Sequence, residues 1–197
     1  MNELRKDLRA ITADGAAFSV MVGTGETYLP AFVVALSGSQ LAAGLIATVP
    51  MAVGALLQLI SPCAIRHLHS YKAWVVLCAV VQSLTFLPLV AAAALGSIPT
   101  GALFALASVY WAMTLGAGPA WNAWVDTLVP RAQRASFFAR RTLVGQVGLL
   151  LGFVGGGCLL QATTAGGQHL GGFALLFLLA AVARLVSACC LHSQREL

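Results

Sequence analysis

Charged side chains are scarce in this sequence. Asp, Glu, Lys and Arg make up 9% of its 197 residues, whereas apolar residues make up 59%, and a soluble domain typically carries about 25% charged residues. The composition therefore excludes a soluble globular domain. A chain dissolved in lipid closes its backbone hydrogen bonds within helices or a closed barrel. The strict apolar–polar alternation of barrel strands is missing too, so we predict an all-α integral membrane protein.

The motifs of enzymes and metal sites are also missing. The sequence has no Gly-x-x-x-x-Gly-Lys phosphate loop, no pair of histidines at helical spacing and no nucleophile elbow. Its five cysteines show no metal-ligand spacing and lie in or beside apolar runs. We therefore expect no enzymatic activity, no metal and no cofactor.

Long apolar runs are what the sequence has in abundance. Each is about as long as the roughly 20 residues that a membrane helix needs, and only short segments separate them. The sequence predicts one membrane domain over residues 1–197 with six transmembrane helices, at about 13–36, 40–62, 73–95, 99–125, 141–162 and 170–190.

Lys and Arg are absent from the loops near 37–39, 96–98 and 163–169. Because basic residues stay on the cytoplasmic side of a membrane, this asymmetry predicts that both termini are cytoplasmic. The net charge of +5 is then a signal of topology, and we expect no nucleic-acid partner. Arg184, near the end of the last run, is expected to extend to the membrane surface. All eleven basic residues map to the cytoplasmic side: Arg5, Lys6, Arg9, Arg66, Lys72, Arg131, Arg134, Arg140, Arg141, Arg184 and Arg195.

Small residues recur at every fourth position in the first and fifth runs. This spacing lets the backbones of membrane helices approach closely, so we predict two close-packed seams. Plain helix packing explains such seams, and the alternative is that they slide during a conformational cycle. The glycines concerned are Gly23 in the first run and Gly148, Gly152 and Gly156 in the fifth.

A carboxylate interrupts the first run within Gly-Thr-Gly-Glu-Thr-Tyr-Leu-Pro, residues 23–30. Burying a charge in a membrane costs about 2.5–3.5 kcal/mol on insertion scales, and Pro30 weakens the helix one turn after Glu26. Glu26 is either a proton acceptor or ligand of a cationic solute, or a structural acid whose hydrogen bond bridges two helices. Further polar candidates for a pathway are Tyr28, Gln58, Gln82 and Asn122. Helix–helix hydrogen bonds explain Gln58 and Gln82 equally well, and an aromatic belt at the cytoplasmic end of the fourth run is the favoured explanation for Asn122.

The segment 118–146 carries a family resemblance. It contains Pro-Ala-Trp-Asn-Ala-Trp, then Leu-Val-Pro, then Arg-Ala-Ser-Phe-Phe-Ala-Arg-Arg, and it resembles the middle of the amino-terminal half of bacterial major facilitator superfamily (MFS) transporters. The resemblance implies a six-helix half in the bacterial cytoplasmic membrane, built as a three-plus-three inverted repeat with a pathway near the midplane.

Two features depart from that family. The loop Ser-Pro-Cys-Ala-Ile-Arg-His-Leu-His-Ser-Tyr-Lys, residues 61–72, keeps Arg66 but has Ile65 where the family has an aspartate. The fourth run lacks the embedded arginine of proton-coupled drug exporters, so drug export is not implied. A cytoplasmic gate could still form from Arg66, Asp126, Arg140 and Arg141, although such clusters more often anchor topology.

Family members usually have twelve helices in two halves. The resemblance therefore implies secondary transport of a small solute across the bilayer, with the second half supplied by another copy of the chain or by other membrane subunits. The alternative is a non-transporting structural or accessory subunit of a larger membrane complex.

Overall fold

Each of the apolar runs lies in a helix in the computed structural model, which describes residues 2–196. Within those residues, six helical stretches are long and apolar enough to cross a membrane: Glu3–Ser37, Gln40–Leu68, Tyr71–Leu95, Thr100–Leu128, Arg131–Ala165 and Gly171–Ser193. The predicted all-α, multi-pass architecture is confirmed. Most of these stretches extend beyond the apolar runs at the end that carries the basic residues, because a helix continues past the hydrocarbon layer into turns that mix apolar and charged side chains.

Short 3₁₀ turns divide some of these stretches into separate helices. In chain order the elements are α1 (Asn2–Thr24), η1 (Glu26–Tyr28), α2 (Leu29–Ser37), α3 (Gln40–Leu57), η2 (Gln58–Ile60), α4 (Ser61–Leu68), α5 (Tyr71–Leu95), α6 (Thr100–Leu128), η3 (Arg131–Gln133), α7 (Arg134–Ala165) and α8 (Gly171–Ser193).

The first span breaks at η1, where the sequence places Gly25 before and Pro30 after the turn. Pro30 occupies the first turn of α2, where its missing N–H leaves no helical hydrogen bond unmade. The backbone N–H of Tyr28 donates to the Gly25 carbonyl at 3.2 Å, closing the tighter turn. The break predicted beside Glu26 is present, and it places this residue at the junction of two helices.

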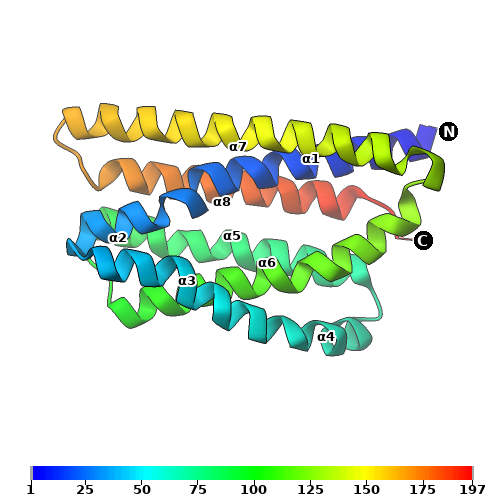
Figure 1. The fold of residues 1–197 in the computed structure, drawn as a ribbon, viewed down its shortest axis with the longest axis horizontal. Coiled ribbons are helices and arrows are strands. Elements are labelled where there is room, and N and C mark those ends of the chain that lie inside the picture. Colours follow the sequence, from blue (N-terminus) through cyan, green and yellow to red (C-terminus); the bar gives the residue numbers. More distant parts are fainter. Residues whose placement is uncertain (1, 197) are drawn as a thin grey trace.

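The helices pack in two groups that Figure 1 shows on opposite sides of the bundle. In one group α1 lies against α7 and α8, and in the other α6 lies against α3 and α5. Contacts between α5 and α8 join the two groups. Both ends of the chain lie at the same end of the bundle (Figure 1).

The outside of the bundle is apolar. Large side chains on the outer faces are extensively exposed, with Leu41 at 74%, Leu56 at 70% and Leu151 at 67%. Exposing apolar area to water costs a free energy of roughly 25 cal/mol for each Å², whereas exposing it to lipid carries no such cost. The surface is that of a membrane protein.

The buried interior consists of two apolar clusters. One contains Phe32, Phe86 and Phe177, and the other contains Ile11 and Trp124 and lies nearer the chain ends. Along each of α1, α5, α6 and α8, polar side chains fall between the members of the two clusters. The buried polar residues Asp14, Gln82, Arg184 and Ser187 belong to this intermediate layer.

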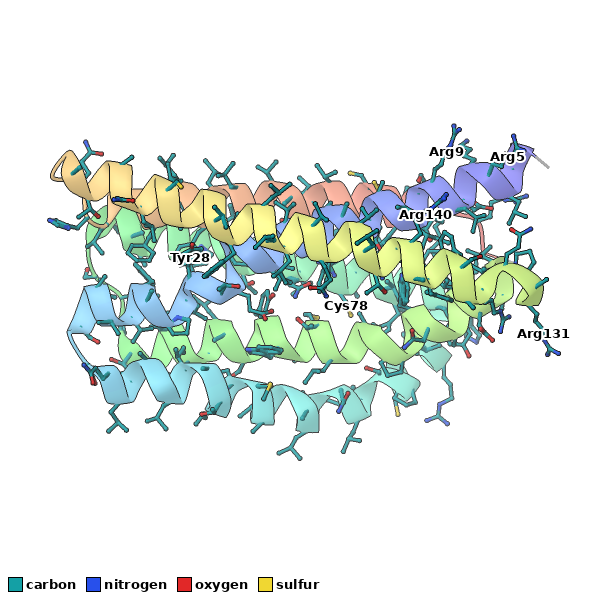
Figure 2. The ribbon with its side chains drawn as sticks, turned by 45° about the horizontal axis from the view of Figure 1, so that its top comes forward. Arg5, Arg9, Tyr28, Cys78, Arg131 and Arg140 are labelled. Carbon is teal, nitrogen blue, oxygen red and sulfur yellow. The ribbon has the colours of Figure 1, made fainter. Side chains whose placement is uncertain are left out.

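The end of the bundle that holds the chain ends is also the basic end. Figure 2 shows Arg5, Arg9, Arg131 and Arg140 toward this end. The segment after α8 is fixed there by polar contacts: Arg195 Nη2 lies 2.8 Å from Asp7 Oδ2 in α1, and its carbonyl accepts from Trp124 Nε1 at 2.9 Å.

Candidate functional site

Glu26 is paired with a tyrosine from the opposite helix group. The Tyr110 hydroxyl, in the middle of α6, donates to Glu26 Oε2 at 2.6 Å. Tyr110 is 5% exposed, so the bond is largely shielded from bulk water. The contact joins the broken first span to the fourth span. Among residues 2–196 Glu26 has no ion-pair partner within 4.0 Å.

A cavity of about 180 Å³ lies beside Glu26. We call it the Glu26 cavity. Its polar lining comes from Glu26, Thr27, Thr85 and Tyr110, and the rest of the lining is apolar. A single buried water needs about 10–15 Å³, so the cavity has room for several waters or a small solute. The carboxyl of Glu26 is half-buried at this cavity.

A second polar centre lies closer to the basic end. Arg184, on α8, is 4% exposed and donates through Nη1 to Ser187 Oγ at 2.6 Å. Ser187 in turn donates to Asp14 Oδ1, on α1, at 2.6 Å. Asp14 is 3% exposed, so the serine hydroxyl bridges a buried guanidinium and a buried carboxylate. The expectation that Arg184 reaches the membrane surface is wrong, because these partners hold it inside the bundle.

Gln82 and Thr114 connect the two polar centres. Arg184 Nε donates to Gln82 Oε1 at 2.6 Å, and Gln82 Nε2 donates to Thr114 Oγ1 at 2.5 Å. A guanidinium only donates hydrogen bonds, so it fixes the amide orientation of Gln82. Thr114 then donates to the Tyr110 carbonyl at 2.9 Å. Hydrogen-bonded residues thus run from Glu26 to Asp14, positions about 18 Å apart along a helix axis.

Arg141 adds a second guanidinium beside Asp14. Its Nη2 lies 3.5 Å from Asp14 Oδ2, and its guanidinium carbon lies 4.3 Å from the centre of the Trp121 ring. A cavity of about 230 Å³ is lined by Asp14, Trp121, Arg141, Arg184 and neighbouring residues including Thr114 and Asn122. We call it the Arg184 cavity.

The structure divides the predicted pathway residues among different places. Glu26 lines the Glu26 cavity, whereas Gln82 belongs to the hydrogen-bonded chain and Asn122 lines the Arg184 cavity. Tyr28 points away from Glu26, and its hydroxyl donates to the Phe153 carbonyl on α7. Gln58 lies in the turn between α3 and α4, outside both cavities.

The predicted gate residues are not brought together. Asp126 pairs with Arg134 at 2.6 Å, within the connection from α6 to α7. Arg141 faces Asp14 instead, while the exposed Arg140 lines a groove between α7 and α1 together with Arg5 and Arg9. Arg66 donates to Cys63 Sγ on its own helix at 3.2 Å. A gating role for these residues stays a prediction.

The glycines of the first and fifth runs meet in one interface between α1 and α7. A Cβ added at Gly152 would lie 3.0 Å from the Val20 carbonyl oxygen, and one at Gly148 would lie 3.2 Å from the Ala16 carbonyl oxygen. A Cβ at Gly23 would contact the Leu149 carbonyl, and one at Gly156 would lie 2.6 Å from the Tyr28 ring. The two helices therefore pack backbone against backbone, beside the site.

Sequence reasoning missed Asp14, Tyr110 and Ser187. Asp14 stands at the start of the first apolar run, where it reads as a boundary residue. One signal was available: Asp14 and Arg184 are opposite charges within apolar runs, and each needs a partner in lipid. Tyr110 and Ser187 carry no such signal, since neither residue is unusual in a membrane helix.

Both cavities are lined by side chains that can exchange protons or bind anions. Among residues 2–196, no group of three or more His, Cys, Asp or Glu side chains is placed to hold a metal ion. A carboxyl hydrogen-bonded to a phenol beside a cavity can exchange a proton, and guanidinium groups can bind anions. Comparison of the chain with protein-family models, with curated proteins and with solved structures finds no match in any of the three.

Proposed function

We propose that this chain is one half of an MFS-like secondary transporter of the bacterial cytoplasmic membrane. In this proposal it moves a small solute together with a second half, supplied by another copy or by another membrane subunit. The buried chain of hydrogen-bonded polar residues and the two cavities support this proposal, because ionisable groups embedded in a membrane mark substrate and ion pathways.

The pairing of the helices supports a three-plus-three inverted repeat. In the exchange that relates the two halves of such a repeat, the first span (α1) corresponds to the fourth (α6), the second (α3) to the fifth (α7), and the third (α5) to the sixth (α8). The contact between α1 and α7 then corresponds to that between α6 and α3, and the contact between α1 and α8 corresponds to that between α6 and α5. The pair α5–α8 is exchanged with itself. The Glu26 cavity is lined by the first four spans, and the exchange converts these into the fourth, fifth, sixth and first spans. All four of these line the Arg184 cavity, which the third span also lines. In transporters built in this way the solute site lies at the repeat interface near the midplane.

The orientation follows from the basic residues. Since Lys and Arg favour the cytoplasmic side, we place the end with both chain ends in the cytoplasm. The Glu26 cavity then faces the outer half of the membrane, and the Arg184 cavity faces the inner half.

One observation carries the proposal: Glu26, at a helix break, shares its carboxyl between Tyr110 and a cavity. A carboxyl that only tied helices together would need no cavity. Desolvation disfavours the charged form of a carboxyl and water restores it, so movement of α2 relative to α6 changes how readily Glu26 holds a proton.

Glu26→Gln tests this reading, because it keeps the size and the hydrogen bond but cannot titrate. We would reconstitute the full chain in liposomes with an entrapped pH-sensitive dye, and add lactate, alanine and glucose in turn. We expect at least one solute to change the internal pH, and Glu26→Gln to abolish that change while its melting temperature stays within about 2 °C of wild type. Glu3→Gln, the same change at the exposed end of α1, is the matched control and should transport normally.

The structural alternative gives the opposite pattern. If Glu26 is a permanently protonated acid, Gln replaces it without effect and Ala destabilises the packing by about 0.6–2 kcal/mol. Unchanged transport in Glu26→Gln would rule out proton coupling at this residue. An absence of transport for every solute, with a stable Gln variant and a destabilised Ala variant, would favour the accessory-subunit alternative.

A further inference from the structure

The Arg184 cavity has a surplus of positive charge. Two guanidinium groups, those of Arg141 and Arg184, and one carboxyl, that of Asp14, line it. Asp14 is shared: Oδ2 faces Arg141 at 3.5 Å, and Oδ1 reaches Arg184 only through Ser187. The carboxyl therefore balances one guanidinium at most.

The remaining acidic residues do not remove this surplus. Glu26 lines the other cavity and bonds to Tyr110, and Asp126 is held by Arg134 with its side chain 60% exposed. Glu3 and Asp7 face Arg195 at the basic end, where Glu196 accepts from Ser70. The rings of Phe18 and Trp121 lie against the guanidinium groups of Arg184 and Arg141 and stabilise them, but they carry no negative charge, so the cavity keeps a net positive charge.

The cavity also has more hydrogen-bond donors than the protein uses. Among residues 2–196, the indole Nε1 of Trp121 has no hydrogen-bond partner, but it is fully buried and does not open to the cavity. Arg184 donates through Nε and Nη1, and within the same residues Nη2 has no hydrogen-bond partner. The Asn122 amide adds a further donor at an exposed part of the lining. An unsatisfied buried donor costs about 1–3 kcal/mol, so an acceptor placed in this cavity would be favourable.

We infer that the Arg184 cavity binds the anionic oxyacid group of a small solute, such as a carboxylate. This inference rests on the proposed transport function and names the chemical class of its substrate. The planar guanidinium groups match a carboxylate in geometry and charge, and the Asn122 amide supplies a further donor on the lining. A volume of about 230 Å³ accommodates a small organic anion with some of its water.

An anionic lipid offers the same oxyacid chemistry through its phosphate. The depth of Arg184 favours a solute: it lies thirteen residues after Gly171 and nine before Ser193 in α8, about 20 Å and 14 Å along the helix axis. A lipid phosphate stays near the membrane surface and reaches the level of Arg141 more readily than that of Arg184.

The test is ligand-dependent thermal stability of the purified full chain in neutral detergent. The probes are acetate, lactate, benzoate and inorganic phosphate, with acetamide, lactamide and benzamide as uncharged analogues, at ionic strength matched by sodium chloride. We expect at least one anion to raise the melting temperature by about 3–5 °C at ten times its half-saturating concentration, and its amide to have no effect.

Two adjacent arginines provide matched variants. Arg141 lines the cavity and Arg140 does not, so Arg141→Gln should weaken anion binding at least tenfold and Arg140→Gln should leave it unchanged. Asn122→Ala, which removes the exposed amide on the lining, should weaken binding severalfold and serves as a second variant should Arg141→Gln fold poorly.

Three results would overturn the inference. The first is that no anion stabilises the wild-type chain, and the second is equal anion binding by Arg141→Gln and Arg140→Gln. The third is stabilisation by added phosphatidylglycerol alone, which would assign the site to a lipid. The anion-site inference and the transport proposal can fail separately. If glucose or alanine is transported but no anion binds, the anion site is rejected and transport stands. If an anion binds but no solute is transported, transport is rejected and the anion site stands.

Discussion

Replacing Ser187 with alanine tests whether the buried polar chain stabilises the bundle. The hydroxyl is fully buried and takes part in two hydrogen bonds, one from Arg184 Nη1 and one to Asp14 Oδ1, both at 2.6 Å. Alanine removes both bonds and adds no bulk. Because Arg184 and Asp14 are 4% and 3% exposed, bulk water has little access to the groups that lose their partner.

The expected loss follows from the number of bonds. Hydrogen bonds between membrane helices contribute about 0.6 kcal/mol on average and up to about 1.7 kcal/mol. Two such bonds give a loss in the free energy of unfolding of about 1–3 kcal/mol. For a chain of this length that corresponds to a fall in melting temperature of roughly 3–10 °C.

Ser193→Ala on the same helix is the control. Its hydroxyl is exposed and donates to the Cys190 carbonyl of its own helix at 2.7 Å, so its loss removes no hydrogen bond between helices. Melting of the two variants in the same detergent isolates the buried bonds. A difference below about 0.5 kcal/mol, the range of ordinary surface substitutions, would refute the view that this hydroxyl holds α8 to α1.

Further predictions concern packing, topology and assembly. Gly152→Ala should destabilise by about 1–3 kcal/mol through overpacking against α1, whereas Gly155→Ala, which meets open space, should be neutral or stabilising; equal melting temperatures would contradict the seam. In a cysteine-free background, a cysteine at Gly166 should react with an impermeant thiol reagent on intact cells and one at Ser70 only after permeabilisation, and the reverse pattern would invert the topology. Native mass analysis should show a dimer or a complex with other membrane subunits, and a monomer competent in transport would contradict the need for a second half.

The helical architecture is readable from the sequence because lipid imposes a simple rule on it. A span must satisfy its backbone internally over about 20 apolar residues, so the apolar runs locate each helical stretch within residues 2–196 that is long and apolar enough to cross a membrane. The break beside Glu26 was predictable for a similar local reason, since Pro30 cannot continue a regular hydrogen-bond ladder.

The site was harder to predict because its partners are distant in sequence. Ser187 and Asp14 are 173 residues apart, and Tyr110 and Glu26 are 84 residues apart. Apolar periodicity says that a helix crosses the membrane but not which of its faces meets which neighbour. Glu26 was identified because it is an acid deep in a run, whereas the residue that accompanies it, Tyr110, looks like any other aromatic residue of a membrane helix.

The length of α7 has a consequence for the choice of lipid. With 32 residues it is about 48 Å long, whereas the 23 residues of α8 give about 34 Å, close to the roughly 30 Å of a typical hydrocarbon core. A bilayer that suits α8 leaves about 14 Å of α7 outside the hydrocarbon, and Figure 1 shows α7 extending past α8. Because the apolar run of α7 covers only residues 141–162, about 33 Å, its extra turns lie in the headgroup layers, and they place the exposed Arg140 where anionic lipid headgroups attract basic side chains.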